Sequence, residues 1–304
     1  MDVYAKIDSR SHLVKIPDLD RLNITVYMKR EDEIHPIISG NKWRKLKYNV
    51  QHMHLTSQNT LVTFGGAFSN HIAAVAEVCG QIGISGIGIV RGERHEPLNS
   101  TLSFAESRGM ELHFVSRGLY KDSKSECAER IMDGKDYYLI PEGGANELGV
   151  KGCEEILTDD ERKNFDMITC SAGTGTTSAG LLRTLGEKQS LMVYSALKGD
   201  FLYESIIELS GLDDGIGTLD LTDDYCFGGY AKTNEELFDF ITDFYKSSSI
   251  KLDPIYTGKM MYGLVEDCKK GRIEQGTRVL AIHTGGLQGI EGVERRDNVT
   301  LFTK

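Results

Sequence analysis

A basic cluster near the N-terminus is the first feature of the sequence that could do chemistry. The segment SGNKWRKLKYN, residues 39–49, surrounds the chain's only tryptophan with Lys42, Arg44, Lys45 and Lys47. Such a cluster is unexpected in a protein whose formal net charge is −10. A lysine whose amine is kept unprotonated by burial or by nearby cations can act as a nucleophile. The segment is therefore either a basic patch or the place of one chemically special lysine.

A loop rich in glycine and hydroxyl residues is the strongest single signal. The segment TCSAGTGTTSAGLL, residues 169–182, reads as an apolar strand, a loop and the start of a helix. Backbone N–H groups of such a loop, with the helix N-terminus behind them, form a cradle for an anion such as phosphate. It is not a Walker loop, because no Gly-Lys-Ser/Thr follows. The candidate phosphate ligands are Ser171, Gly173, Thr174, Gly175, Thr176 and Thr177.

The same loop nearly matches the dinucleotide-binding pattern GxGxx[G/A], with Gly173, Gly175 and Ser178 in the three places. That pattern needs an acidic residue at the end of the next strand to bind the ribose. The next strand, SLMVYSALKGD, ends near Ser195, and its acid, Asp200, comes late. A nicotinamide-dependent oxidoreductase therefore remains an alternative with reduced support.

Three consecutive polar residues stand where another helix is expected to begin. In TFGGAFSNHIAAV they are Ser69, Asn70 and His71, directly after a glycine pair and a short turn. Ser and Asn are favoured at helix N-caps, and the exposed N–H groups there favour a bound carboxylate. A cap alone explains one such residue better than three in a row, so the segment is a candidate substrate site.

Two late motifs also place polar side chains beside glycines. In DPIYTGKMMYGL, Tyr256 is either a packed aromatic or an acid–base group that faces a ligand. The neighbouring Lys259 can be read as a surface cation. In AIHTGG, Thr284 leaves a strand directly before a glycine pair.

The elements that must position these residues alternate between short apolar runs and helical patterns, which is the rhythm of βαβ units. We expect strands at TLVTF (60–64), MITCSAG (167–173) and TRVLAIHTGG (277–286), with helices after the first two. This alternation predicts parallel sheets covered by helices on both faces. Ligands in such folds bind beyond the carboxyl ends of the strands. Glycine pairs follow three strand-like runs there, at 65–66, 143–144 and 285–286.

The length and composition of the chain limit the kinds of protein that it can be. A chain of 304 residues predicts two domains or one large α/β domain. Its acidic balance argues against a nucleic-acid surface, and small molecules are the expected partners. Six scattered cysteines without a CxxC pair fit a reducing compartment. The most apolar stretch is interrupted by Glu77, Gln81 and Ser85, and no signal peptide opens the chain. We therefore expect a cytoplasmic protein without membrane contact.

No metal site is expected. His52 and His54 would point to opposite sides if they lay on a strand, and no obvious acidic partner accompanies them. The chain also lacks the GxSxG elbow typical of serine hydrolases.

Six motifs together resemble one enzyme family. SGNKWRK, FGGAFSNH, PEGGAN, SAGTGTTSAG, DPIYTGK and HTGG occur in the order seen in pyridoxal-phosphate enzymes of the tryptophan-synthase-β type. Within that group the chain is similar to the 1-aminocyclopropane-1-carboxylate deaminase and D-cysteine desulfhydrase family, from roughly residue 7 to residue 290. The resemblance implies a homodimer of two-domain subunits, each domain an open, twisted, mostly parallel sheet flanked by helices. The smaller domain would hold residues 45–147, and the larger would combine 1–44 with 148–304.

The resemblance also assigns roles around the cofactor, pyridoxal 5'-phosphate. It makes Lys42 the lysine that holds the cofactor in a Schiff base, with Lys45 as the fallback. Asn70 would contact the 3-hydroxyl of the ring, and the loop 173–177 would hold the phosphate. Around Lys42, Trp43 is expected to pack on the core, while Lys45 and Lys47 are expected on the helix surface.

On the substrate side, the resemblance implies that Ser69, Asn70 and His71 receive the carboxylate of an amino acid. Tyr256 would act as an acid–base or positioning group, and whether Ser69 or Tyr256 transfers a proton stays open. The family commonly has Gln where this chain has Phe68, directly before Ser69.

Two positions favour one reaction over the other. The deaminases of this family usually carry Glu and Leu where this chain has Thr257 and Thr284, whereas the desulfhydrases carry hydroxyl residues. A carboxylate beside the ring nitrogen keeps it protonated, which helps to open a cyclopropane, and a neutral threonine does not. We therefore expect D-cysteine desulfhydrase-type α,β-elimination that gives pyruvate, ammonia and sulfide. The alternative is 1-aminocyclopropane-1-carboxylate deamination to 2-oxobutyrate and ammonia.

Overall fold

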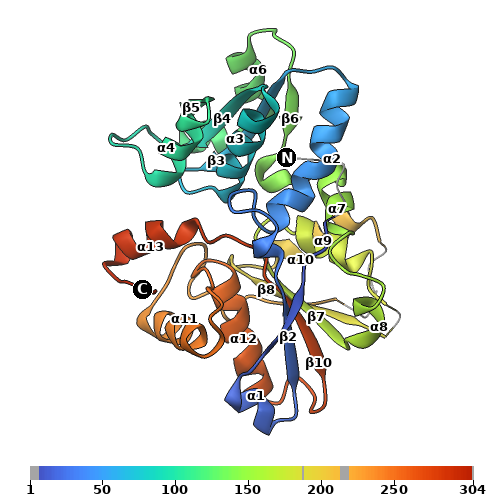
Figure 1. Cartoon of the computed structure of the whole chain (residues 1–304). Coiled ribbons are helices and arrows are strands. Elements are labelled where there is room, and N and C mark those ends of the chain that lie inside the picture. The colour runs from blue at the N-terminus through green and yellow to red at the C-terminus, as the bar shows by residue number, and fades with distance from the viewer. Residues whose placement is uncertain (1–6, 187, 213–218, 303–304) are drawn as a thin grey trace.

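The computed structural model describes residues 7–186, 188–212 and 219–302. In these ranges the chain forms two sheets, one of four strands and one of six, each covered by helices (Figure 1). The expected fold class, α/β with mostly parallel sheets, is confirmed. No helix in the described ranges has the length and apolar character needed to cross a membrane.

The four-stranded sheet is parallel throughout, in the order β5-β4-β3-β6. Consecutive residues of β3 enter different cores, because side chains alternate across a strand. Leu61 packs with α2 (Asn41–Leu55) and α3, and Val62 packs with α5 and α6. The strands are β3 (Thr60–Gly66), β4 (Ser85–Arg91), β5 (Met110–Val115) and β6 (Tyr138–Ile140). The helices between them are α3 (Asn70–Ile82), α4 (Ser100–Ser107), α5 (Arg117–Asp122) and α6 (Lys124–Met132).

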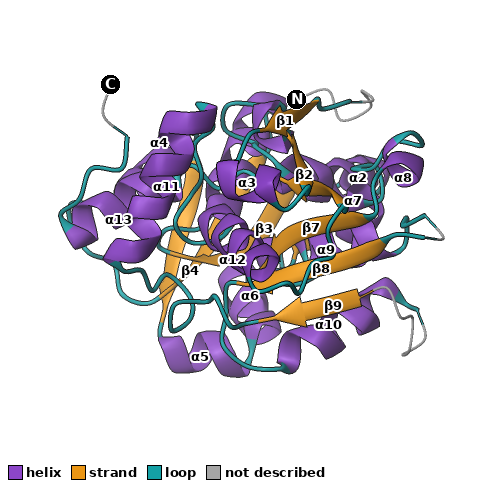
Figure 2. Cartoon of the chain, turned by 90° about the horizontal axis from the view of Figure 1, so that it is seen from below, coloured by secondary structure: helices purple, strands orange, loops and turns teal. Residues whose placement is uncertain are grey.

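The six-stranded sheet has the order β1-β2-β10-β7-β8-β9, and only the β1–β2 pair is antiparallel. Figure 2 shows β2, β7, β8 and β9 in this order across the sheet, with β10 between β2 and β7. The strands are β1 (Ser11–Val14), β2 (Thr25–Lys29), β7 (Met167–Ala172), β8 (Ser190–Ser195), β9 (Leu219–Thr222) and β10 (Arg278–Ile282).

Helices bury both faces of this sheet. Along β10, Val279 joins a core with α11 and α12, and Leu280 joins one with α7, α9 and α10. The helices are α1 (Pro17–Arg21), α7 (Glu147–Cys153), α8 (Glu161–Asn164), α9 (Thr176–Leu182), α10 (Phe201–Ser210), α11 (Glu235–Ser248), α12 (Thr257–Lys269) and α13 (Gly289–Asp297). Two 3-10 turns, η1 (Glu31–Glu33) and η2 (Glu142–Gly144), complete the elements.

Helix α2 (Asn41–Leu55) carries the basic cluster, packs against α7 and α3, and shares a hydrophobic core with the smaller sheet. Trp43 lies in the core beside that sheet, as expected. The predicted surface position of Lys45 and Lys47 is wrong, because both are buried, at 3% and 6% exposure. Lys47 reaches Glu155 at 2.7 Å, a partner 108 residues away.

Two further sequence-based expectations concern residues of α2. His52 and His54 lie in its last turn and not on a strand, so the argument that they point to opposite sides of a strand does not apply. The predicted domain boundary between residues 44 and 45 falls inside the helix. The division into 45–147 and 1–44 with 148–304 therefore stays a prediction. The strands between residues 60 and 140 form the smaller sheet, and the strands before and after this range form the larger sheet.

Candidate active site

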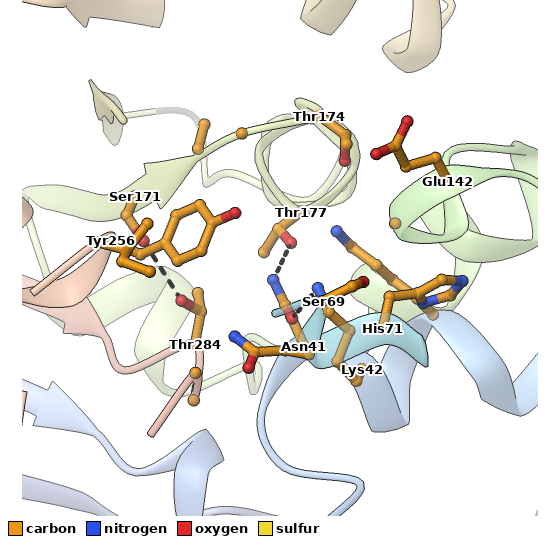
Figure 3. A pocket seen from close by; sticks show the side chains of 18 of the residues that line it. Asn41, Lys42, Ser69, His71, Glu142, Ser171, Thr174, Thr177, Tyr256 and Thr284 are labelled. Atoms are coloured by element: carbon orange, nitrogen blue, oxygen red, sulfur yellow. Dashed lines mark hydrogen bonds between the residues drawn. The ribbon is translucent and has the colours of Figure 1, made fainter. Parts of the chain in front are cut away.

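A cavity of about 340 Å³ lies where the two sheets face each other. Its wall takes residues from the carboxyl ends of strands in both sheets: Gly66 and Arg91 end β3 and β4, Ser171 lies near the end of β7, and Thr284 follows β10. This is the edge at which open parallel sheets bind ligands. The basic cluster, the glycine loop, the start of α3 and the late motifs meet here, although the chain separates them by up to about 240 residues, from Lys42 to Thr284 (Figure 3).

Lys42 presents its amine to the cavity from the first turn of α2. Lys42 Nζ donates to Asn41 Oδ1 at 3.1 Å, and Asn41 Nδ2 donates to Thr177 Oγ1 at 2.9 Å (Figure 3). Burial, with the nearby charge of Lys45, lowers the pKa of Lys42 to about 7. A large share of the amine is therefore unprotonated at neutral pH, as a nucleophilic lysine requires.

The turn before Lys42 requires glycine. Gly40 has φ of 61°, and a Cβ there would lie 2.0 Å from the carbonyl oxygen of Thr284. The close approach ties the start of α2 to the residue after β10, and Asn41 N donates to the same carbonyl at 3.2 Å. This contact fixes the amine of Lys42 relative to the larger sheet.

Lys45, the fallback candidate for the Schiff-base lysine, also lines the cavity and does not lie on the exposed helix surface. Burial lowers the pKa of its amine, and no hydrogen bond joins it to another described residue. A buried cation without a partner is costly. The position of Lys45 in the cavity wall, which also contains Thr174, therefore favours an anionic ligand.

The glycine loop contributes most of the residues predicted for it. Gly173, Thr174, Gly175 and Thr177 line the cavity, and Ser178 joins them. Thr176 does not: it is fully buried, outside the wall, and its hydroxyl is 3.1 Å from that of Thr174.

The start of α3 forms another part of the wall, with Ser69, Asn70 and His71. Ser69 is the N-cap, and its Oγ accepts from Ile72 N at 3.3 Å. The side-chain oxygen of Asn70 is buried and lacks a hydrogen-bond partner within the described structure. It can accept a hydrogen bond from a ligand hydroxyl.

His71 is neutral and oriented. Burial, and then the charges of Lys42 and Lys45, lower its pKa well below the usual value. The hydroxyl of Thr63 donates to the carbonyl oxygen of Ile140 at 2.8 Å, so it accepts from His71 Nε2 at 3.0 Å. The proton then resides on Nε2, and Nδ1, which is buried without a described partner, is an acceptor.

Tyr256 reaches the cavity together with a residue that the sequence did not point out, Tyr230. The two rings lie 6.2 Å apart, and each hydroxyl lies close enough to the other to change its pKa. Burial raises the pKa of both groups, and the pKa of Tyr256 lies well above its usual value, so both hydroxyls stay protonated at neutral pH. The glycine pair before Tyr230 in CFGGYAK could have marked this tyrosine as a candidate site residue. The sequence did not show that Tyr230 lies beside Tyr256.

The two threonines that favoured elimination differ in their position relative to the cavity. Thr284 lines the cavity, and its hydroxyl lies 3.3 Å from that of Ser171 (Figure 3). Thr257 lies outside the wall, fully buried, and donates to Asp253 Oδ1 at 2.7 Å. Asp253 caps the start of α12 and accepts the Thr257 hydroxyl together with the backbone N–H groups of residues 255–257, so the expected contact of Thr257 with the cofactor stays a prediction.

Lys259 is not the surface cation that the sequence suggested. It is 1% exposed, and its amine donates to the carbonyl oxygens of Cys226 and Gly229 at 2.7 and 2.8 Å. Burial lowers the pKa of Lys259 to about 8. These bonds hold the loop that leads into Tyr230.

The residues present fit an aldehyde cofactor that carries a phosphate and a ring hydroxyl. Lys42 supplies the amine for the aldehyde, and Lys45 with the glycine loop supplies the positive and N–H groups for the phosphate. The unpaired oxygen of Asn70 supplies an acceptor for the hydroxyl.

Comparisons with known proteins agree with this set of groups. A family model described as pyridoxal-phosphate dependent enzyme matches residues 6–285. The chain is 33% identical to a putative 1-aminocyclopropane-1-carboxylate deaminase of Pyrococcus horikoshii, over 90% of this chain and 88% of that protein. It is 29% identical to a bifunctional mitochondrial D-cysteine desulfhydrase/1-aminocyclopropane-1-carboxylate deaminase of Arabidopsis thaliana, over 94% and 78%. A crystal structure described as an ACC deaminase homologue superposes with a TM-score of 0.80 at 29% identity, covering 97% of this chain and 94% of that one.

Proposed function

The chain belongs to the pyridoxal-phosphate dependent enzyme family, and from that premise we propose that it is an amino-acid lyase of the D-cysteine desulfhydrase type. The net reaction would convert cysteine and water into pyruvate, ammonia and hydrogen sulfide. The nicotinamide alternative loses its basis, because the matching family depends on pyridoxal phosphate.

The cofactor, when bound, supplies an aldehyde for the amine of the substrate and an electron sink for the pair left by the α C–H bond. Lys42 would hold it as a Schiff base until a substrate amine takes its place. A pKa near 7 leaves much of the released Lys42 amine unprotonated, so it can then accept the α proton. Lys45 and the loop 173–177 would hold the phosphate end.

The start of α3 would bind the substrate carboxylate through backbone N–H groups and the hydroxyl of Ser69. Neutral His71 fixes this turn from behind through its bond to Thr63. Asn70 would use its unpaired oxygen for the ring hydroxyl of the cofactor.

The Tyr256–Tyr230 pair would supply a proton to the departing sulfur. Both hydroxyls are protonated at neutral pH, and they lie close enough to affect each other's pKa, so one tyrosine can act as the donor with the other beside it. Ser69, whose hydroxyl accepts the capping bond from Ile72 N at 3.3 Å, would instead contact the substrate carboxylate.

The choice of reaction rests on one observation: the end of the cavity at Ser171 and Thr284 carries neutral hydroxyl groups. The hydroxyls of Ser171 and Thr284 lie there, and the nearby buried carboxylate, Asp253, is bound to the start of α12 and is not part of the wall. Within the described wall the carboxylate is Glu142, which pairs with Lys124 at 2.6 Å. Loss of a β-thiolate needs less activation of the ring than opening a cyclopropane, so this wall favours elimination.

By the same family resemblance we propose a cytoplasmic homodimer. Its subunits would have a smaller domain at 45–147 that closes on the substrate and excludes water.

The test is to load the purified protein with pyridoxal phosphate and to supply D-cysteine, L-cysteine and 1-aminocyclopropane-1-carboxylate in parallel. We expect pyruvate and sulfide in equal amounts from a cysteine enantiomer, and none from a Lys42→Ala variant, which should also lack the visible absorbance of the Schiff base. If 2-oxobutyrate from the cyclopropane substrate were the only product, the deaminase would be the correct assignment.

A further inference from the structure

An arginine at the cavity mouth has no role in the function proposed above. Arg91 is the last residue of β4, and the parallel register places it opposite Gly66 of β3. Both residues line the cavity. A Cβ built on Gly66 would lie 3.5 Å from Arg91 Nη2, so the guanidinium lies over Gly66, three residues before the helix cap Ser69.

Arg91 is not neutralised by the protein. No hydrogen bond or ion pair joins its guanidinium to any residue in the described ranges, and its contact is the face of the Tyr120 ring, 5.5 Å away. The acid of the wall, Glu142, is bound by Lys124 at 2.6 Å. Three residues further on, Arg94 is in the opposite situation, because it pairs with Glu96 and Glu106 at 2.6 and 2.9 Å.

The charge of Arg91 acts across the cavity. Tyr230 belongs to the larger sheet's side of the cavity and Arg91 to the smaller one, yet the guanidinium lowers the pKa of the Tyr230 hydroxyl and so opposes part of the increase caused by burial. Arg91 therefore faces the space between the two sheets, beside the tyrosine pair that would protonate a leaving group.

The other cationic and N–H groups of the wall already have proposed partners in the cofactor or the substrate. Lys42 and Lys45 serve the aldehyde and phosphate of the cofactor, and the start of α3 serves the α-carboxylate of the substrate. The remaining part of an amino acid is its side chain, which must extend toward the open mouth.

We propose that Arg91 forms a subsite for a second negative charge, carried by the β-substituent of the amino-acid substrate. This inference rests on the proposed function and names its substrate class: amino acids whose β-substituent is an anion, such as a sulfate, phosphate or carboxylate group. A guanidinium binds such oxyanions with two parallel N–H bonds, which gives both affinity and orientation.

A matched pair of substrates tests this subsite. O-Acetylserine and serine O-sulfate both lose a β-oxygen substituent. The α proton is removed, and the electron pair of the Cβ–O bond leaves with acetate or sulfate. Water then supplies the keto oxygen of pyruvate as ammonia is released. Pyruvate formation by the cofactor-loaded enzyme is measured for both esters and both enantiomers. The variants are Arg91→Gln, Arg91→Lys and, as a control, Arg94→Gln, which removes a neighbouring arginine outside the wall.

We expect kcat/KM for the sulfate ester to exceed that for the acetyl ester by about tenfold in the unaltered enzyme, mainly through KM. Arg91→Gln should abolish this preference by lowering kcat/KM for the sulfate ester about tenfold more than for the acetyl ester, Arg91→Lys should keep part of it, and Arg94→Gln should keep all of it. Equal preference in Arg91→Gln and the unaltered enzyme would overturn the subsite while leaving the lyase intact. Failure of both esters, with no change in the cofactor spectrum on adding either, would instead overturn the proposed function and the subsite together.

Discussion

Thr257 Oγ1 donates a hydrogen bond to Asp253 Oδ1 at 2.7 Å, and the side chains of both residues are fully buried. The same hydroxyl accepts from Asp253 N at 2.9 Å, so donor and acceptor capacity are both used. A residue that the sequence placed beside the cofactor therefore helps to fix the start of α12, the helix that follows Tyr256.

Replacing Thr257 with Val should lower the free energy of unfolding by about 1–3 kcal/mol, because a buried N–H and a buried carboxylate each lose a partner. Denaturant unfolding of the cofactor-free protein measures the loss, and Thr257→Ser, which keeps the hydroxyl, should retain most of the stability. A Thr257→Val protein with full stability but weakened cofactor binding would show that the hydroxyl turns to the cavity instead.

The depressed pKa of Lys42 should make stability depend on pH in a defined direction. Its folded pKa of about 7 lies below the value of an unfolded lysine, so between these values the unfolded chain binds more protons and stability rises with pH. In the cofactor-free protein Lys42→Met removes this cost. We expect the variant to be more stable than the unaltered protein at about pH 6, with a difference that shrinks toward about pH 10.

Thermal unfolding at several pH values measures the effect of Lys42→Met. Lys47→Met on the same helix is the control, because Lys47 is buried in an ion pair with Glu155 and its loss should destabilise the protein. A stability difference for Lys42→Met that does not change with pH would contradict the lowered pKa.

Lys45→Met should weaken binding of pyridoxal phosphate by about 10- to 100-fold, because a charge-assisted bond to phosphate is lost. Titration of the cofactor-free protein, followed by absorbance, measures the affinity. Inorganic phosphate should compete with the cofactor in the unaltered protein and less in the variant. Unchanged cofactor affinity in Lys45→Met would exclude this lysine from the phosphate site.

Lys259→Met should lower kcat through Tyr230, because the amine of Lys259 holds the carbonyl oxygens of Cys226 and Gly229 in the loop before that tyrosine. A double-mutant cycle with Tyr230→Phe separates this role from a general loss of stability. If Lys259 acts by positioning Tyr230, its replacement should cost about tenfold in kcat alone and little in the Tyr230→Phe background. Equal losses in both backgrounds would show that Lys259 only stabilises the fold.

The sequence by itself determined the elements and much of the site. The expected strands at 60–64 and 167–173 appear as β3 and β7, and the polar start at Ser69 is the N-cap of α3. These features depend on hydrophobic periodicity and on capping between residues three apart, so they are local. Lys42, the glycine loop and Tyr256 then meet in one cavity because the carboxyl ends of parallel strands share an edge.

The tertiary structure alone decided which polar side chains are buried and what they contact. Lys45 faces the cavity, Lys259 holds a loop through carbonyl groups 30 and 33 residues earlier, and Thr257 turns to Asp253. Tyr230 and Arg91 join the cavity from opposite sides. Burial and hydrogen-bond partners depend on which distant segments pack together. The sequence alone therefore does not distinguish a lysine that faces solvent from one that contacts a carbonyl group or a substrate.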